Sequence, residues 1–418
     1  MKKHLIPLTL SAASSLLVLA STVEAKTFTE SMQQGSSIKV NVRTRFEDVT
    51  EDVLNTNVDR EADAWTTRLR LSYQSGPWNG FSFFAEMDDV SEMTNDVDYR
   101  TAPNDTAFPA ATTAVIADPV GTELNQGFIA YTDFNNQVKM GRQRLVLDNS
   151  RFIGNVGWRQ NEQTYDGLSW TNKTIRYTNF TYMYIKNANR IFGDTNVIGD
   201  VHMDSHVLNA SYTGFDAGKL IGYTYMLDVN DPILPALAAN NPKRMTSDTF
   251  GIRWQGTIGE SFLYNLEYAT QKDAGELESF DADYMLAEAI YNVSRYSFTL
   301  GYESLGSDDG AYGFATPLAT LHAFQGWADK FLNTPAAGLN DVYANVGITF
   351  AGAQALISYH QYDSDEGSID FGDEIDFSLS RKFGSVVWTA KYASYSMGDT
   401  NASFTDTEKF WLMADWNF

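Results

Sequence analysis

Four arginines lie close together between Gly141 and Trp170, in a chain that is otherwise acidic. They are Arg142, Arg144, Arg151 and Arg159, and they fall within 18 residues of a sequence with a formal net charge of −23. An arginine is always charged, and its rigid fork of donors suits carboxylate, sulfate or phosphate groups. The stretch therefore indicates either a site for acidic solutes or internal pairing with some of the 53 Asp and Glu residues.

The elements that position this stretch follow from a two-residue periodicity along the chain. Segments of roughly ten residues alternate apolar and polar side chains between turn residues, as transmembrane β-strands do. In the segment 296–302, for example, Tyr296, Phe298 and Leu300 share one face. Aromatic residues make up 14% of the sequence, which fits the aromatic girdles of an outer-membrane barrel.

Short and long connections alternate between these segments. Eight short turns, such as 259–260, alternate with nine long loops, such as 92–121 and 306–340. The pattern predicts an all-β fold, a transmembrane antiparallel up-and-down β-barrel of about 18 strands, with 16 as the neighbouring possibility. Short turns would face the periplasm, and a barrel of this size has room for a water-filled lumen.

The N-terminus predicts the compartment. Lys2 and Lys3 precede a largely apolar segment, and small residues lead up to Ala25, as in a secretory signal peptide. We expect residues 1–25 to be removed and residues 26–418 to form the barrel in the bacterial outer membrane. The negative charge argues against nucleic acid as a partner, and the absence of cysteine excludes disulfides and thiolate metal sites.

The same alternation places a row of arginines on the polar, lumen-facing side of two neighbouring strands. The row consists of Arg43, Arg45, Arg68 and Arg70. Charged rows on low-dielectric walls steer solutes of opposite sign, so the row predicts selectivity for anionic or hydroxyl-rich solutes. A ladder of ion pairs with inward acids such as Glu47, Glu86 and Asp88 is the alternative.

The stretch 141–170 itself predicts a strand at 137–145, a loop at 146–160 and a strand at 161–170. Its alternation is broken, because Met140, Arg142 and Arg144 share parity with Val138. Either a bulge near Gly141 resets the phase or apolar residues also line the lumen there. We expect the loop to fold inward, so that Arg151 and Arg159 narrow the channel.

An acidic run between Asp363 and Asp376 is a candidate for a metal. It contains Asp363, Asp365, Glu366, Asp370, Asp373, Glu374 and Asp376. Oxygen donors suit Ca²⁺, but the spacing of an EF-hand is missing, so we favour a solvated loop and expect no cofactor.

Residues 141–170 also resemble the central signature of the alginate-export-like porin family. The matching motifs are Gly141-Arg142-Gln143, Arg151-Phe152-Ile153-Gly154, Trp158-Arg159-Gln160 and Thr164-Tyr165-Asp166-Gly167. The resemblance implies an outer-membrane channel with an arginine-rich lumen that suits uronate polymers or related acidic saccharides.

These observations predict a porin and not an enzyme: a passive channel for small hydrophilic, anionic or saccharide-type solutes. Eight arginines are the expected pore lining: Arg43, Arg45, Arg68, Arg70, Arg142, Arg144, Arg151 and Arg159. Export of an alginate-like acidic polysaccharide, or a plugged barrel that acts as a surface receptor or adhesin, are the alternatives. Membrane lipid and lipopolysaccharide are the expected surroundings, and monomer and trimer both stay open.

Overall fold

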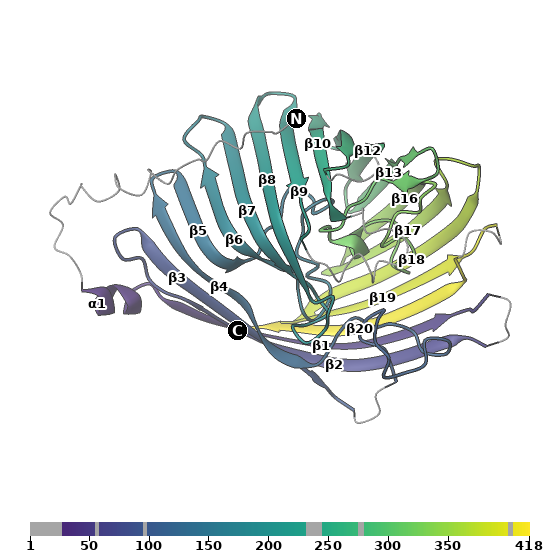
Figure 1. Ribbon diagram of the computed structural model, residues 1–418, viewed down its shortest axis with the longest axis horizontal. Helices are drawn as coiled ribbons and strands as arrows, with labels where there is room; N and C mark the ends of the chain where they lie inside the picture. Colours follow the sequence, from purple (N-terminus) through teal and green to yellow (C-terminus); the bar gives the residue numbers. More distant parts are fainter. Residues whose placement is uncertain (1–26, 55–57, 95–97, 231–244, 275–279, 400–403) are drawn as a thin grey trace.

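Eighteen antiparallel strands form one barrel in the computed structural model, which describes residues 27–54, 58–94, 98–230, 245–274, 280–399 and 404–418 (Figure 1). Each strand pairs with the next along the chain, and β1 pairs with both β2 and β20, which closes the sheet. The predicted up-and-down barrel of 18 strands is therefore confirmed. The predicted signal peptide lies outside the described residues.

The first nine strands are β1 (Ser37–Glu51), β2 (Arg60–Gln74), β3 (Phe81–Glu92), β4 (Gly121–Asp133), β5 (Asn136–Gln143), β6 (Thr164–Asn172), β7 (Thr178–Asn189), β8 (Asp200–Phe215) and β9 (Gly218–Leu227). The other nine are β10 (Ser247–Ile258), β11 (Phe262–Lys272), β12 (Asp281–Val293), β13 (Tyr296–Leu305), β16 (Leu339–Phe350), β17 (Ala353–Asp363), β18 (Asp370–Phe383), β19 (Val386–Ser396) and β20 (Thr407–Asn417).

Three short elements lie outside the barrel wall. Helix α1 (Phe28–Gln33) precedes β1, and the N-cap Thr27 and Glu30 form a capping box. A small hairpin, β14 (Ser307–Asp308) and β15 (Tyr312–Gly313), and a 3-10 helix, η3 (Leu321–Ala323), belong to the long connection between β13 and β16. Among the described residues, no helix is both long and apolar enough to cross a membrane.

The two faces of the wall have opposite chemistry. Ile252, Leu300 and Phe350 are each more than half exposed on the outside, whereas Arg45 and Glu374 are fully buried on the inside. A wall that is apolar on the outside and polar on the inside is the arrangement that a barrel needs in lipid. The strand alternation in the sequence is therefore an alternation between lipid and lumen.

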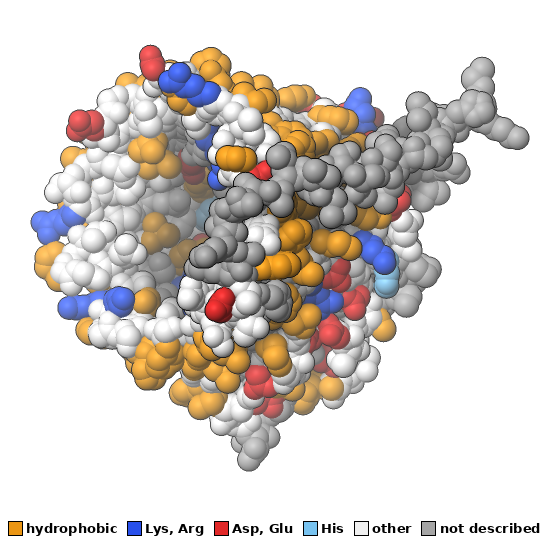
Figure 2. All heavy atoms as spheres, turned by 90° about the vertical axis from the view of Figure 1, so that its left-hand side faces the viewer, with side chains coloured by type: hydrophobic (Ala, Val, Ile, Leu, Met, Phe, Trp, Pro, Cys, Tyr) orange, Lys and Arg blue, Asp and Glu red, His pale blue; other side chains and the backbone are white. Residues whose placement is uncertain are grey.

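The interior is filled by connections from the long-loop end. Side chains such as Phe152, Phe314 and Phe331 from two of them join a buried cluster with wall residues that include Tyr284 and Tyr362. Figure 1 shows these connections inside the curve of the sheet. Figure 2 looks at the end that carries α1 and short turns, where the surface is hollowed and a histidine is visible at depth.

The phase problem near Gly141 has a different solution from both predicted ones. Pairing of β5 with β4 and β6 runs without a shift through Gly141, and the irregularities lie nearby, at Glu86/Met87 and at Asp166/Gly167. The predicted bulge at Gly141 is wrong, because register depends on the partner strand and not on the local sequence. Apolar residues do not line the lumen there either, since Met140 is exposed on the outside.

Gly141 is needed for close approach. Its φ is 128°, and a Cβ at this position would lie 2.3 Å from the carbonyl oxygen of Gly127 on β4. The strands on either side of the following loop are shorter than predicted there, since β5 ends at Gln143 and β6 begins at Thr164. The loop between them therefore spans residues 144–163.

Candidate functional site

Two connections meet inside the barrel, loop 144–163 between β5 and β6 and loop 306–338 between β13 and β16. The Gly154 N–H donates to the Leu318 carbonyl at 2.8 Å, and the Thr320 N–H donates to the Ser150 carbonyl at 3.0 Å. Ile153 and Leu318 also form an isolated parallel bridge. The expected inward fold of the arginine loop is thus what the structure has, with a second loop packed against it.

The arginine row of β1 and β2 holds the backbone of loop 144–163. Arg43 Nη1 donates to the Gly157 carbonyl at 3.1 Å and to the Trp158 carbonyl at 2.9 Å. Arg68 Nη1 donates to the Gln160 carbonyl at 3.2 Å. Because carbonyls carry only partial charge, these contacts do not neutralise the two guanidinium groups, and Arg68 Nε has no hydrogen-bond partner among the described residues.

Arg45 has a full counter-charge from a third connection. Its guanidinium lies 3.0 Å from Asp118, which also accepts the Gln160 N–H at 2.8 Å. It donates to the Trp158 carbonyl as well. Asp118 comes from the connection between β3 and β4, so this buried carboxylate joins two loops to the wall.

Glu162 performs the same role at the other end of loop 144–163. Arg70 contacts Glu162 at 2.9 Å and Asp88 at 2.5 Å, and Arg144 contacts Glu162 and, at 3.2 Å, Glu86. Burial opposes ionisation of Glu162, but its hydrogen bond with Arg144 and the charge of Arg70 lower its pKa to about 2. Arg70 and Arg144 are therefore paired with carboxylates.

The two loop arginines are buried and paired as well. Arg159 lies 2.8 Å from Glu47 on β1 and 3.7 Å from Asp329 in loop 306–338. Arg151 lies 2.6 Å from Glu303 on β13 and donates to Thr316 at 2.9 Å. Both side chains lie inside the barrel and tie the loop to the wall, and their part in a pore constriction stays a prediction.

Arg142 differs from the other seven arginines that the sequence predicts to line the pore. It shares the strand face of Met140, pairs with Asp166 at 2.9 Å and donates to the Leu124 carbonyl at 3.1 Å. Its part in a pore lining remains a prediction.

A second cluster in the lumen was missed by the sequence analysis. The ammonium of Lys391, on β19, lies over the rings of Trp158 and Trp327 at 4.1 Å and 3.6 Å. It donates to His322 Nε2 at 2.8 Å. The only signal in the sequence is parity, because Lys391 shares the inward face of β19 with Ala393 and Tyr395.

His322 connects this cluster to Asp329. The ring stacks on Trp158 with centroids 4.3 Å apart, and its Nδ1 lies 2.8 Å from Asp329, which also contacts Lys409 at 3.0 Å. Burial lowers the pKa of His322 to about 3, so the ring is neutral and can accept from Lys391. Although burial opposes it, His322 and Lys409 hold the pKa of Asp329 below its usual range.

The acidic run is divided between loop and strand. Glu374 and Asp376 are buried on the inward face of β18, whereas Asp363 and Asp365 are exposed. Within the described ranges, no group of three or more His, Asp or Glu side chains could hold a metal ion. The loop Ca²⁺ stays a prediction.

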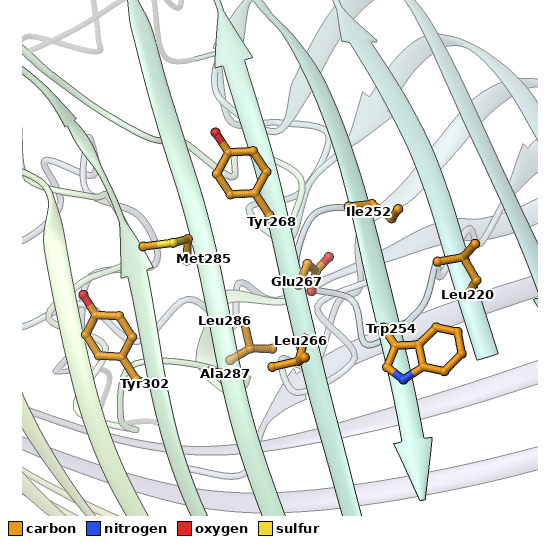
Figure 3. Close-up of a pocket in the computed structure, with 10 residues that line it drawn as sticks. All are labelled: Leu220, Ile252, Trp254, Leu266, Glu267, Tyr268, Met285, Leu286, Ala287 and Tyr302. Atoms are coloured by element: carbon orange, nitrogen blue, oxygen red, sulfur yellow. The ribbon is translucent and has the colours of Figure 1, made fainter. Parts of the chain in front are cut away.

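A groove of about 370 Å³ lies on the outside of the barrel and not in the lumen (Figure 3). Ile252, Leu266 and Met285, which line it, are exposed on the outward face of adjacent strands. It arises where small Ala287 lies opposite Leu266 and Tyr302. In a barrel this surface faces lipid, so it does not bear on solute passage.

Several solved bacterial proteins of similar length match this chain over most of its sequence. They include OccAB2 of Acinetobacter baumannii, with a TM-score of 0.68, 18% identity, and coverage of 93% of this chain and 99% of the other. OccK9 (OpdG) of Pseudomonas aeruginosa has a TM-score of 0.69, 13% identity, and coverage of 93% and 99%. OpdK of Pseudomonas aeruginosa, solved with vanillate, has a TM-score of 0.66, 12% identity, and coverage of 91% and 98%. At these identities the likeness establishes the fold.

Comparison with curated proteins finds no match. The profile of the alginate export family matches residues 35–291, which include β1 to β11 and loop 144–163. Its members are export and porin proteins and not enzymes, and the fold places the protein in the Gram-negative outer membrane as a porin-like barrel. The chain belongs to the alginate export family.

Proposed function

We propose that the protein is a passive diffusion channel for small hydrophilic solutes, with a preference for anionic or saccharide-type solutes. Transport would follow the solute gradient, because a porin-like barrel has no coupled reaction. The proposal rests on the charge and the hydrogen-bonding groups of the inner wall.

The observation that carries the anion preference is the pair Arg43 and Arg68. These residues are directly opposite each other on β1 and β2. Like charges in this position are destabilising, so their presence favours a functional reason. The nearest carboxylate to Arg43 is Asp415 at 3.5 Å, and in the part of the chain that the structure describes Arg68 forms no ion pair. The other lumen arginines described above are offset by acids, so the preference depends on this pair.

Support for saccharides comes from the wall nearer the short turns. Hydroxyl and amide side chains pair across strands there, as Thr389 does with Ser380 at 3.2 Å and Gln255 with Asn265 at 3.3 Å. Such groups both donate and accept, and sugar hydroxyls offer the complementary set. They can exchange partners with a passing solute without exposing a bare charge.

Reversal potentials in planar bilayers under a salt gradient test the arginine pair. We expect anion preference in the wild type and a shift toward cation preference in Arg43→Ala/Arg68→Ala. Arg381→Ala is the matched control, because Arg381 is exposed and lies over Phe383 away from the lumen. Strong cation selectivity of the wild type, unaltered in the double variant, would contradict the hypothesis that these arginines set the selectivity. Liposome swelling with neutral sugars, uronates and amino acids would then rank the solutes.

Two other functions are each supported by a specific observation. The apolar core that Ile153, Phe314 and Leu318 form inside the barrel favours a plugged receptor or adhesin. The family match favours export of an alginate-like acidic polysaccharide. Single-channel recording separates the first from a porin, since a plugged barrel shows no steady open state. Polymer flux into polymer-free liposomes tests the second.

A further inference from the structure

Lys391 and Asp376 are buried on the inner wall, and neither has a close partner of opposite charge among the described residues. Lys391 Nζ is held by the indole faces of Trp327 and Trp158, by Trp411 at 5.5 Å and by neutral His322. In the described part of the chain, no ion pair joins it to a carboxylate. A buried ammonium with no paired carboxylate is destabilising unless its surroundings compensate, and here the indole faces and the His322 acceptor do so.

Asp376 is the complementary case. Its side chain is fully buried, and both carboxylate oxygens lack a hydrogen-bond partner. The Glu374 carboxyl and the Trp327 backbone lie next to it, and His360 Nε2 is 4.0 Å away. A buried carboxylate in this state is destabilising where it is.

The two residues are within reach of each other. On the paired strands β18 and β19, Asp376 lies opposite Ala393, and Lys391 lies opposite Ser378. Lys391 is therefore a diagonal cross-strand neighbour of Asp376 on the same face, a spacing that a long side chain can bridge. A rotation of the lysine side chain, with no movement of the wall, would bring ammonium and carboxylate together.

What keeps them apart comes from the two inward loops. Trp158 belongs to loop 144–163, and Trp327 and His322 belong to loop 306–338. Only Trp411 is part of the wall. If the loops leave the lumen, Lys391 loses two of its three indoles and its hydrogen-bond acceptor at once.

We propose that Lys391 is a two-position gate residue. With the loops docked, it occupies the box of Trp158, Trp327, Trp411 and His322 and ties both loops to the wall. With the loops released, it pairs with Asp376 and stabilises the released state. This gives the lumen two discrete arrangements, which is what gating requires. The proposal concerns regulation of the channel proposed above and rests on that function for its physiological meaning.

Thiol labelling tests the switch without reference to conduction. The chain contains no cysteine, so Ala319→Cys gives a single reporter at a buried position of loop 306–338, away from Asp376. We expect a water-soluble thiol reagent to label this variant in liposomes at a rate set by loop release. Adding Asp376→Asn should slow labelling by about tenfold, because the released state loses its ion pair. Glu288→Gln, which removes another inward carboxylate four strands away along the wall, should leave the rate unchanged.

A charge exchange separates the switch from a structural role. In Lys391→Asp/Asp376→Lys the wall pair is restored, but a carboxylate faces the indole box, so labelling should be faster than in Ala319→Cys alone. Unchanged or faster labelling with Asp376→Asn, or unchanged or slower labelling in the exchange variant, would overturn the proposal. If the wild-type barrel shows no conductance while Asp376→Asn still slows labelling, the switch stands and the channel function falls.

Discussion

Arg151 shows how a single residue holds a loop in the lumen. It is fully buried, and its contacts with Glu303, Thr316 and Gln325 join loop 144–163 to the wall and to loop 306–338. Removing one partner of a buried pair leaves the other charge uncompensated, which costs about 3–5 kcal/mol. We expect Arg151→Met to lower the free energy of unfolding by about that amount in urea titrations of the barrel in lipid.

The double variant Arg151→Met/Glu303→Gln is the control for this prediction. It removes both charges, while Tyr284 and Gln325 can still hydrogen-bond the new amide. Most of the lost stability should return. Equal losses in the single and double variants would show that packing, and not the unpaired carboxylate, accounts for the effect.

At the residue scale, the sequence predicts which face of a strand a side chain occupies, but it does not predict which residues that side chain contacts. Alternation along β1 and β2 is enough to predict that Arg43 and Arg68 share the polar face, because a strand has only two faces. It could not match Arg159 to Glu47, since that contact spans 112 positions and depends on the path of a loop. Lys391 was missed for the same reason: its parity is visible, but its indole partners come from distant loops.

At the scale of elements, the two inward loops form one unit because a glycine lets them touch. A Cβ on Gly154 would lie 2.2 Å from Thr320 Oγ1 and 2.9 Å from the Thr320 backbone nitrogen. Gly154→Ala should therefore separate loop 144–163 from loop 306–338. We expect faster labelling of Ala319→Cys and a larger mean conductance, with the barrel still resistant to urea.

Gly222→Ala is the matched control for Gly154→Ala. Gly222 lies on β9, and a Cβ there would have no atom within 4 Å. Labelling and conductance should stay at the wild-type level. An equal response of both variants would indicate that the loops do not depend on contact at Gly154.

The strands and the loops differ in how far sequence could predict them. A strand such as β13 is specified locally, by alternation of apolar and polar residues between two turns, so its position can be predicted from its own sequence. The inward path of loop 306–338 depends on wall residues such as Glu374, which accepts the Ala328 N–H at 2.7 Å. That path has no periodic signature. The same limit explains the wrong bulge at Gly141, whose phase is set on neighbouring strands.

At the scale of the whole molecule, the barrel tolerates wide change in sequence. A TM-score of 0.68 at 18% identity means that few particular residues are required for the fold. An apolar outer face and a closed set of backbone hydrogen bonds suffice in lipid. What distinguishes one barrel from another is then the content of the lumen, here the charged groups that hold the docked loops.

Those groups predict how the docked loops respond to acid. The depressed pKa values of Asp329 and Glu162 keep both carboxylates ionised in mild acid, and arginines stay charged. His322 is a group of the docked loops whose protonation differs in this range. It faces Asp329, Lys391 and Arg159, and its burial lowers the pKa from 6.5 to about 3. The docked loops therefore exclude a proton that a released histidine would bind.

Acid therefore favours release of the loops. Docking has its full stability above pH 6.5, and it loses stability as the pH falls from 6.5 toward 3, because only the released state takes up the proton. Loop release should rise by about tenfold for each pH unit below the free value, since one unit corresponds to about 1.4 kcal/mol. Open probability recorded at pH 7 and pH 5 checks this. His322→Gln, which cannot titrate, should flatten the response. A flat wild-type profile, or the same rise in His322→Gln, would mean that His322 does not couple acid to the opening of the lumen.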